Sequence, residues 1–293
     1  MDPLKPPGFP GTDWPNVAEL LTLRSNGIVT YRDKFVYATS REELAARIQQ
    51  WLQLSAEQAA LGFKETRDRK SGPALRVPFD ADAIERVSYR PLDRRYLYNR
   101  REYVDFPKRG LQEAWGTDNI ALFAAEDGTG AGPAVWCHSI KPDQHALKGS
   151  YGGWVFPFRN HNPESRGHFL APALIGGLSA AYGRQVAPID VFDAILALLS
   201  ASSYTTRFAF DLEDNFPHVP FPADQDSFSA AARLGARIRA LEGFIAAPEQ
   251  DFCTARLIGQ ASGPTLDVPS PTRAFTTTGL WAQSRCFAIN RSE

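Results

Sequence analysis

The chain has 293 residues and a formal net charge of −1, which argues against a protein that grips nucleic acid by its overall charge alone. Its hydrophobic content of 43% is enough for a globular core, in one large domain or two medium ones. Three cysteines without metal-ligand spacing favour a reduced, cytoplasmic compartment, and there is no apolar run of about 18 residues that would predict a membrane span.

The first 16 residues contain five prolines and two glycines, a composition typical of a linker. We expect residues 1–16 to be the tail of a missing upstream domain. A short helix is expected over residues 15–23. Residues 27–37 then read as two short strands around a polar turn.

Ser40 and Glu43 form a capping-box pattern, and apolar residues recur at helical spacing after it. This predicts a helix over residues 41–54. A second helical piece is expected over residues 56–64.

Several short segments of the middle region have the composition of strands, and Pro91 places Arg90 in a bend or at a sheet edge between the first two. Residues 159–187 are polar and glycine-rich with little periodicity, so no regular element is predicted there. The predicted strands are residues 84–87, 95–98, 119–124, 134–139 and 154–158.

From Pro188 onward the pattern is helical. Asp190 can cap a helix, and Ser227 opens a longer one that should end before Pro248. Residues 216–222 carry three prolines and must be extended. Weak alternation at residues 255–258 and 280–289 predicts terminal strands.

These elements predict an α+β fold, with a mixed β-sheet core and a helical C-terminal portion. After the linker we expect a β-rich subdomain over residues 17–187. A mainly helical subdomain with terminal strands would follow over residues 188–293.

The stretch from Arg86 to Arg109 concentrates positive charge. It carries eight basic residues against three acidic ones, a net +5, and four tyrosines interleave with the arginines. Guanidinium groups match the geometry of phosphate and guanine, and aromatic rings stack or pack beside them. The pattern predicts a nucleic-acid contact surface; the alternative is an edge strand with a solvated charged face.

Sequence motifs for chemistry are missing: there is no glycine-rich phosphate loop, no methyltransferase tetrapeptide Asn/Asp-Pro-Pro-Tyr/Phe and no nucleophile elbow. The five histidines are scattered, which favours surface or hydrogen-bonding roles over a metal site. Acidic residues between positions 211 and 226 could form a nuclease cluster, but a solvated cap between helices is the simpler interpretation. We therefore expect no catalysis in this chain.

Four segments, in order, resemble Type ISP restriction–modification enzymes. Residues 27–36 (GIVTYRDKFV) are similar to that family's GIxTGRDxFV segment, and residues 88–98 (SYRPLDRRYLY) to its YRPFDxRYxY segment. Residues 154–158 (WVFPF) resemble its FPLY strand, and residues 190–207 followed by 215–221 resemble its helix ending in FPRIP.

The resemblance implies a C-terminal target-recognition domain, which in that family follows an adenine-N6 DNA methyltransferase with helicase and nuclease domains before it. The implied function is sequence-specific recognition of double-stranded DNA, with methyltransferase and helicase domains as partners in cis or in trans. No S-adenosylmethionine, metal or nucleotide cofactor is expected, because the target base would be flipped into the methyltransferase. Tyr31 departs from the family pattern, which has glycine there, and Leu92 replaces phenylalanine.

We expect loops to reach base edges in the major groove while strand residues hold phosphates. For Arg90 the alternative is a structural clamp on Asp93 across the bend. The predicted DNA-binding residues are Thr30, Tyr31, Arg32, Lys34, Arg90, Arg94, Arg95, Tyr96, Lys108 and Arg109.

Other functions stay open at this point. A protein-interaction module would use the phenylalanines of residues 208–228 and the helix at 228–245 to dock on a missing methyltransferase or helicase domain. A nuclease would use the acidic residues between 211 and 226. A decayed remnant would retain the fold without binding DNA.

Overall fold

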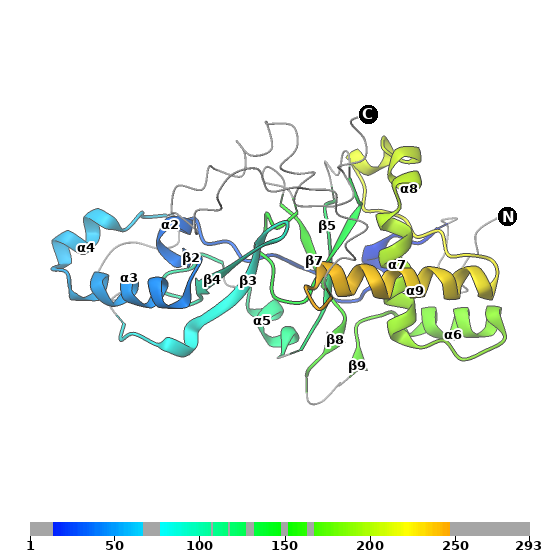
Figure 1. Cartoon of the computed structure of the whole chain (residues 1–293), viewed down its shortest axis with the longest axis horizontal. Coiled ribbons are helices and arrows are strands. Elements are labelled where there is room, and N and C mark those ends of the chain that lie inside the picture. The colour runs from blue at the N-terminus through cyan, green and yellow to red at the C-terminus, as the bar shows by residue number, and fades with distance from the viewer. Residues whose placement is uncertain are drawn as a thin grey trace.

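The computed structural model describes residues 14–66, 77–106, 108–116, 118–126, 132–147, 152–162 and 167–246. A lobe of helices and a small sheet lies at one end of the long axis, a second sheet lies in the centre, and a layer of helices lies at the other end (Figure 1). Most of the predicted linker, and the strands predicted at residues 255–258 and 280–289, fall outside the described residues.

The chain begins with four short elements: α1 (Val17–Leu20), β1 (Ser25–Asn26), α2 (Asp33–Val36) and β2 (Tyr37–Ala38). Helix α1 confirms the helix predicted for residues 15–23. The two strands predicted over residues 27–37 are wrong, since a helical turn occupies Asp33–Val36. The turn forms because the Asp33 carboxylate accepts a hydrogen bond from the Thr30 hydroxyl and fixes the chain as it enters α2.

Helices α3 (Arg41–Gln53) and α4 (Ala56–Gly62) follow the predicted pattern. The Ser40 hydroxyl accepts a hydrogen bond of 3.0 Å from the Glu43 backbone N–H, which caps α3 as expected. The face of α3 that carries Leu44, Ile48 and Trp51 is buried. Both helix predictions are confirmed.

The hairpin of the N-terminal lobe consists of β3 (Ile84–Arg90) and β4 (Asp93–Tyr98), preceded by the 3-10 turn η2 (Ala81–Ala83). The sheet has the order β2-β4-β3, and its ladders are antiparallel. Its apolar face packs on α3 in a core that includes Val36, Leu44, Ile48, Val87 and Leu97. The hairpin that carries Arg86, Arg90, Arg94 and Arg95 is thus packed on α3 through this core.

The central sheet has the order β1-β7-β5-β6, with β5 (Ala121–Ala124), β6 (Val135–His138) and β7 (Trp154–Pro157). Successive residues of β5 pack into two different hydrophobic cores, one on each face of the sheet. Leu122 packs with the C-terminal helices, while Phe123 packs with α5 (Arg109–Trp115) on the opposite face. Burial on both faces explains why these strands are short and almost wholly apolar.

Between residues 167 and 246, the last stretch that the structure describes, the C-terminal layer has five helical elements, and a small ribbon of β8 (Arg159–Asn160) and β9 (Gly167–His168) precedes it. The helical elements are α6 (Pro172–Tyr182), α7 (Pro188–Ser200), α8 (Ser202–Arg207), η3 (Asp211–Glu213) and α9 (Gln225–Glu242). Helix α6 was not predicted, because its Gly176-Gly177 pair and small residues have the composition of a loop. Residues 216–222 contain no helix in the structure, as predicted.

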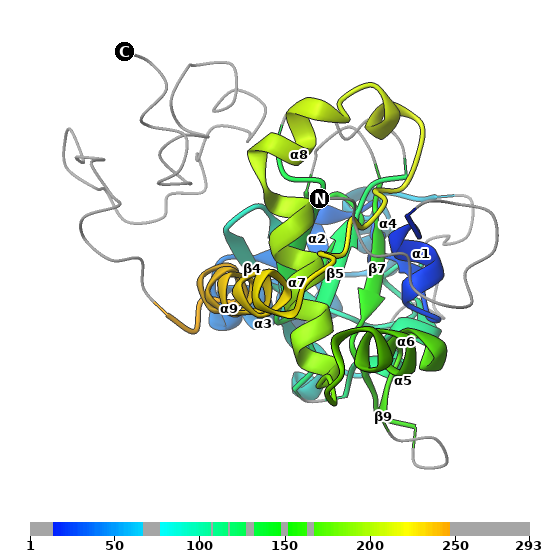
Figure 2. The ribbon, with the colours of Figure 1, turned by 90° about the vertical axis from the view of Figure 1, so that its right-hand side faces the viewer.

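Helices α7 and α9 cross at very close range (Figure 2). A Cβ at Gly235 would lie 1.7 Å from the backbone oxygen of Asp193, so the crossing requires glycine. Arg239 donates hydrogen bonds of 2.7 and 2.9 Å to the two carboxylate oxygens of Asp193. The predicted caps differ in detail: Pro188 begins α7 with Asp190 in its first turn, and Asp224, not Ser227, caps α9.

The α+β class is confirmed, but every ladder between the named strands is antiparallel, and parallel pairing is confined to two isolated bridges. The mixed sheet expected from the sequence is therefore corrected to antiparallel sheets. The boundary at residue 187 stays a prediction; the largest hydrophobic core continues across it, since it joins Leu122 and Phe156 to Phe192 and Phe228.

Candidate nucleic-acid interface

The loop between β1 and α2 is tied to distant parts of the chain. The Ile28 N–H donates to the Pro142 carbonyl at 3.0 Å, and Val29 and Phe106 exchange backbone hydrogen bonds of 3.0 and 3.3 Å. A Cβ at Gly27 would lie 2.6 Å from the Asp143 backbone, so only glycine permits this approach. The loop is therefore held beside the segment that leads into α5.

Tyr31 lies in this loop with a φ of 54°, in the left-handed region. A residue other than glycine pays about 1–2 kcal/mol for this conformation. The backbone thus accounts for the glycine that the resembled pattern has here. The Tyr31 side chain is 56% exposed, and its ring meets Phe106 edge-on with the centroids 6.3 Å apart.

Arg32, predicted as a DNA contact, is a buried cation that is paired within the protein, and its contact with DNA stays a prediction. It is 3% exposed and forms an ion pair of 2.5 Å with Asp105. Its guanidinium also donates to the carbonyls of Lys64 and Tyr103, at 2.7 and 3.0 Å. Thr30 is 1% exposed and bonds Asp33, so it too supports the loop from inside.

Arg90 is also tied up within the protein. Its guanidinium donates to the Asp143 carboxylate at 2.9 Å, lies 3.9 Å from Asp33, and stacks over the Tyr89 ring at 3.9 Å. The structural-clamp interpretation therefore fits Arg90. The carboxylates that it binds are those of Asp143 and Asp33, however, and not that of Asp93, which was expected from the sequence. Burial raises the pKa of Asp143, and it also raises the pKa of Tyr37, whose hydroxyl donates to Asp143 at 3.0 Å.

The remaining hairpin residues pair with one another along β3 and β4. Asp93 forms an ion pair of 2.8 Å with Arg95, and the Arg95 guanidinium also stacks 4.1 Å over the Tyr89 ring. Tyr96 is partly exposed, with the Arg86 guanidinium 5.8 Å from its ring. The positive charge of the hairpin is thus largely balanced or stacked in place.

Arg94 joins the hairpin to the rest of the molecule. It donates to the Ser139 hydroxyl at 2.8 Å and to the Gly243 carbonyl at 2.7 Å, and it stacks 4.1 Å over Phe244. Burial lowers its pKa, with a further contribution from Arg86. Next to this joint, burial and the Arg94 charge lower the pKa of His138 to about 3. Arg94 therefore acts as a connector, not as a free cation on the surface.

Exposed cations gather elsewhere, around the Tyr31 loop. Lys34 and Arg109 are exposed, and the Lys108 ammonium lies 5.3 Å from the Phe106 ring. Lys108 has a φ of 54°, as Tyr31 does, and partial burial lowers its pKa. Sequence reasoning missed Phe106, whose role depends on its pairing with Val29. We call Tyr31, Lys34, Phe106, Lys108 and Arg109 the Tyr31–Lys108 surface.

The catalytic alternatives find no support in the described part of the chain. No group of three histidine, cysteine or acidic side chains there could hold a metal ion. Asp224 caps α9, and Asp211 and Asp214 are exposed, as expected of a solvated cap. No helix among the described residues is long and apolar enough to cross a membrane.

The phenylalanines considered for partner docking divide between core and surface. Phe216, Phe221 and Phe228 are at most 7% exposed, whereas Phe210 is 83% exposed. An apolar pocket of about 380 Å³ lies beside that segment and is lined by residues that include Phe208. The other part of the proposed docking face, at 228–245, also has exposed apolar side chains, since Leu234 is 56% and Ile245 is 70% exposed.

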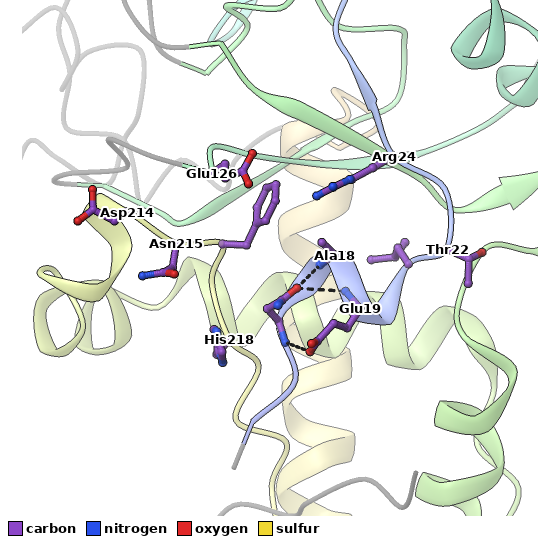
Figure 3. A pocket seen from close by; sticks show the side chains of 11 residues that line it. Ala18, Glu19, Thr22, Arg24, Glu126, Asp214, Asn215 and His218 are labelled. Atoms are coloured by element: carbon purple, nitrogen blue, oxygen red, sulfur yellow. Dashed lines mark hydrogen bonds between the residues drawn. The ribbon is translucent and has the colours of Figure 1, made fainter. Parts of the chain in front are cut away.

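A more polar pocket of about 450 Å³ lies beside α1 and is lined by side chains that include Arg24, Glu19, Glu126 and Asp214 (Figure 3). The Arg24 guanidinium stacks 4.8 Å over the Trp154 ring. Because three carboxylates and one guanidinium line it, the pocket is not a positive surface suited to a phosphate backbone.

Comparison with known proteins gives one family match and a set of similar structures. The model described as the Type ISP C-terminal specificity domain matches residues 19–248. No curated protein matches the chain.

The similar structures share the fold at low sequence identity. A DrdV–DNA complex determined by cryo-EM has a TM-score of 0.61 and 21% identity, over 76% of this chain and 23% of that one. The ATP-dependent Type ISP restriction–modification enzyme LlaBIII bound to DNA has a TM-score of 0.58 and 16% identity, over 80% and 16%. A nuclease-deletion mutant of the Type ISP enzyme LlaGI in complex with a DNA substrate mimic has a TM-score of 0.56 and 17% identity, over 78% of this chain and 19% of that one. The chain spans less than a quarter of each.

Proposed function

The chain belongs to the family of Type ISP C-terminal specificity domains, and on this premise we propose that it reads a specific sequence in double-stranded DNA for a restriction–modification enzyme. The methyltransferase and helicase domains of that enzyme, in cis or in trans, would carry out the chemistry. The similar structures support the proposal, since DrdV and LlaBIII are described as bound to DNA and LlaGI as bound to a DNA substrate mimic.

The observation that carries the proposal is the Tyr31–Lys108 surface. Two segments far apart in sequence are joined by the Val29–Phe106 backbone pairing, and together they carry the exposed Lys34 and Arg109, the half-buried Lys108 and an exposed aromatic ring. Lysine and arginine side chains neutralise phosphates, while neighbouring side chains reach bases. We assign the phosphate contacts to Lys34, Lys108 and Arg109.

The other predicted contacts take different roles in this proposal. Thr30, Arg32, Arg90 and Arg94 position the loops and the hairpin through the internal bonds described above. Arg95 and Tyr96 keep partial exposure on the hairpin, so their contact with DNA stays a prediction. The DNA-contacting set is thus smaller than the arginine content suggests.

The test is selection of bound duplexes by the full chain from a pool with a randomised centre, followed by titration of the selected duplex at several salt concentrations. In Lys108→Ala, affinity should fall about five- to ten-fold near 0.1 M salt, and the slope of log K against log salt should fall by about 0.9. The melting temperature should stay unchanged.

Arg207→Ala is the matched control. Arg207 is an exposed cation whose guanidinium lies 5.5 Å from the Phe208 ring, much as Lys108 lies over Phe106, but it belongs to α8 near the opposite end of the molecule (Figure 1). Its removal changes the net charge equally and should leave affinity within about two-fold. Equal losses in both variants, or no duplex selected by the wild type, would contradict the proposal.

A second candidate function is docking onto another domain, which the exposed Phe210 and the adjacent apolar pocket favour. This role would give self-association or binding to a methyltransferase domain without retention on heparin. Phe210→Ser should then abolish the association.

A further inference from the structure

Tyr31 combines three properties that core packing does not explain. Its backbone is left-handed, with a φ of 54°, its side chain is 56% exposed, and its ring is propped edge-on against Phe106. Glycine adopts such a backbone without strain, and asparagine tolerates it better than an aromatic residue does. A strained residue that places a large ring in solvent points to a contact outside this chain.

The residues on both sides of Tyr31 are tied to other parts of the protein. The Thr30 hydroxyl accepts a hydrogen bond of 3.2 Å from the Arg32 N–H, and the buried Arg32 ties the loop to Asp105. On the other side, Phe106 is held by its backbone pairing with Val29. The backbone that carries the ring and the Phe106 residue that it contacts are thus both held in place, and such preorganisation reduces the entropy lost on binding.

Charge around the ring indicates what it meets. The Lys108 ammonium lies 5.3 Å from the ring of Phe106, the residue on which Tyr31 rests, and the exposed Lys34 lies in α2, three residues after Tyr31. Where cations hold the phosphates, an aromatic side chain that projects between them comes to the bases.

We infer that Tyr31 is a specificity-determining residue of this domain, whose ring contacts the bases at one base step of the target. The inference rests on the proposed DNA-reading function and deepens it. The contact is made by the ring face and edge, not by the hydroxyl on a phosphate, because a hydroxyl could be supplied by serine or threonine, neither of which needs a strained aromatic residue.

The experiment compares Tyr31→Phe, which keeps the ring, with Tyr31→Gly and Tyr31→Asn, which remove it at a backbone that both replacements tolerate. Each full-length variant is used to select duplexes from the randomised pool and is melted by circular dichroism. Tyr31→Phe should select the wild-type target with affinity within about two-fold.

The two ringless variants should melt at or above the wild-type temperature. They should lose about ten-fold or more in affinity for the wild-type target, as expected for loss of one base–aromatic contact. The preference at one base step should disappear, and the salt slope should not change, because tyrosine carries no charge to exchange for counterions.

The outcomes separate this inference from the function on which it rests. If Lys108→Ala weakens binding but the ringless variants keep the wild-type target and affinity, only the inference is overturned. It is also overturned if Tyr31→Phe loses as much as Tyr31→Gly, which would indicate a hydroxyl contact. A wild-type chain that selects no duplex overturns both.

Discussion

The arginine-rich hairpin, β3 and β4, and the Tyr31–Lys108 surface differ in how their charge is used. The hairpin carries four arginines, but only Arg86 is exposed: Arg90 and Arg95 are paired with carboxylates, and Arg94 is bonded to the end of α9. The Tyr31–Lys108 surface has three cations, and Lys34 and Arg109 are exposed there. Charge density along a sequence is therefore a poor guide to the charge that a ligand meets.

The strongest test of this contrast is a substitution of Arg32. This residue belongs to the Tyr31 loop, but like Arg90 of the hairpin it is paired with a carboxylate inside the protein. Arg32→Met leaves the buried Asp105 carboxylate without its cation, so the free energy of unfolding should fall by about 3–5 kcal/mol. Urea unfolding measures the change. Lys34→Met, two residues away and exposed, should change stability by less than about 0.5 kcal/mol. Similar values for the two variants would remove the distinction between internal and surface cations.

The stability of the protein should depend on pH through His138, which lies near Arg94. The pKa of His138 is lowered to about 3 by burial, whereas an unfolded histidine has a pKa of about 6.5. Between pH 6.5 and 3 only the unfolded state binds a proton at His138. The free energy of unfolding therefore falls as the pH is lowered from about 6.5 toward 3. At two pH units below 6.5 this contribution is about 2–3 kcal/mol.

His138→Gln provides the control, because glutamine keeps polarity without titrating. Its unfolding free energy should depend less on pH between about 6.5 and 4 than that of the wild type. Parallel pH profiles for the two proteins would show that His138 does not titrate in this range.

Arg90→Met should lower the free energy of unfolding by about 2 kcal/mol, less than Arg32→Met, because Tyr37 and the His145 N–H still bond the Asp143 carboxylate. Asp93, the partner expected from the sequence, pairs only with Arg95 in the described structure, so Asp93→Asn should cost less than about 1 kcal/mol. A larger loss of stability in Asp93→Asn than in Arg90→Met would instead support the interpretation that Arg90 is clamped on Asp93.

The smallest effect is expected for Arg95, whose ion pair with Asp93 is partly exposed. Arg95→Ala should change stability by less than about 1 kcal/mol and duplex affinity by less than about two-fold. A loss of affinity as large as that of Lys108→Ala, with the same fall in salt slope, would show that the hairpin also contacts DNA.

Local patterns predicted the elements well where capping and periodicity agreed. Ser40 before the apolar stripe of α3 specified that helix, and Pro188 with the apolar face of α7 specified another. The failures have local causes as well. Helix α6 contains a glycine pair, and α2 forms within a segment that has the composition of a strand because Asp33 bonds back to Thr30.

The sequence alone determined the family resemblance, the α+β class and the set of basic and aromatic residues from which a DNA surface could be built. Only the tertiary structure decided which of them face solvent. Arg32 is buried because Asp105 meets it from 73 positions away, and Arg90 is held because Asp143 meets it from 53 positions away. Tyr31 and Lys108 come together through the pairing of Val29 with Phe106. Ion pairs and strand pairings between distant positions leave no periodic trace in the chain, so charge could be counted from the sequence but its exposure could not.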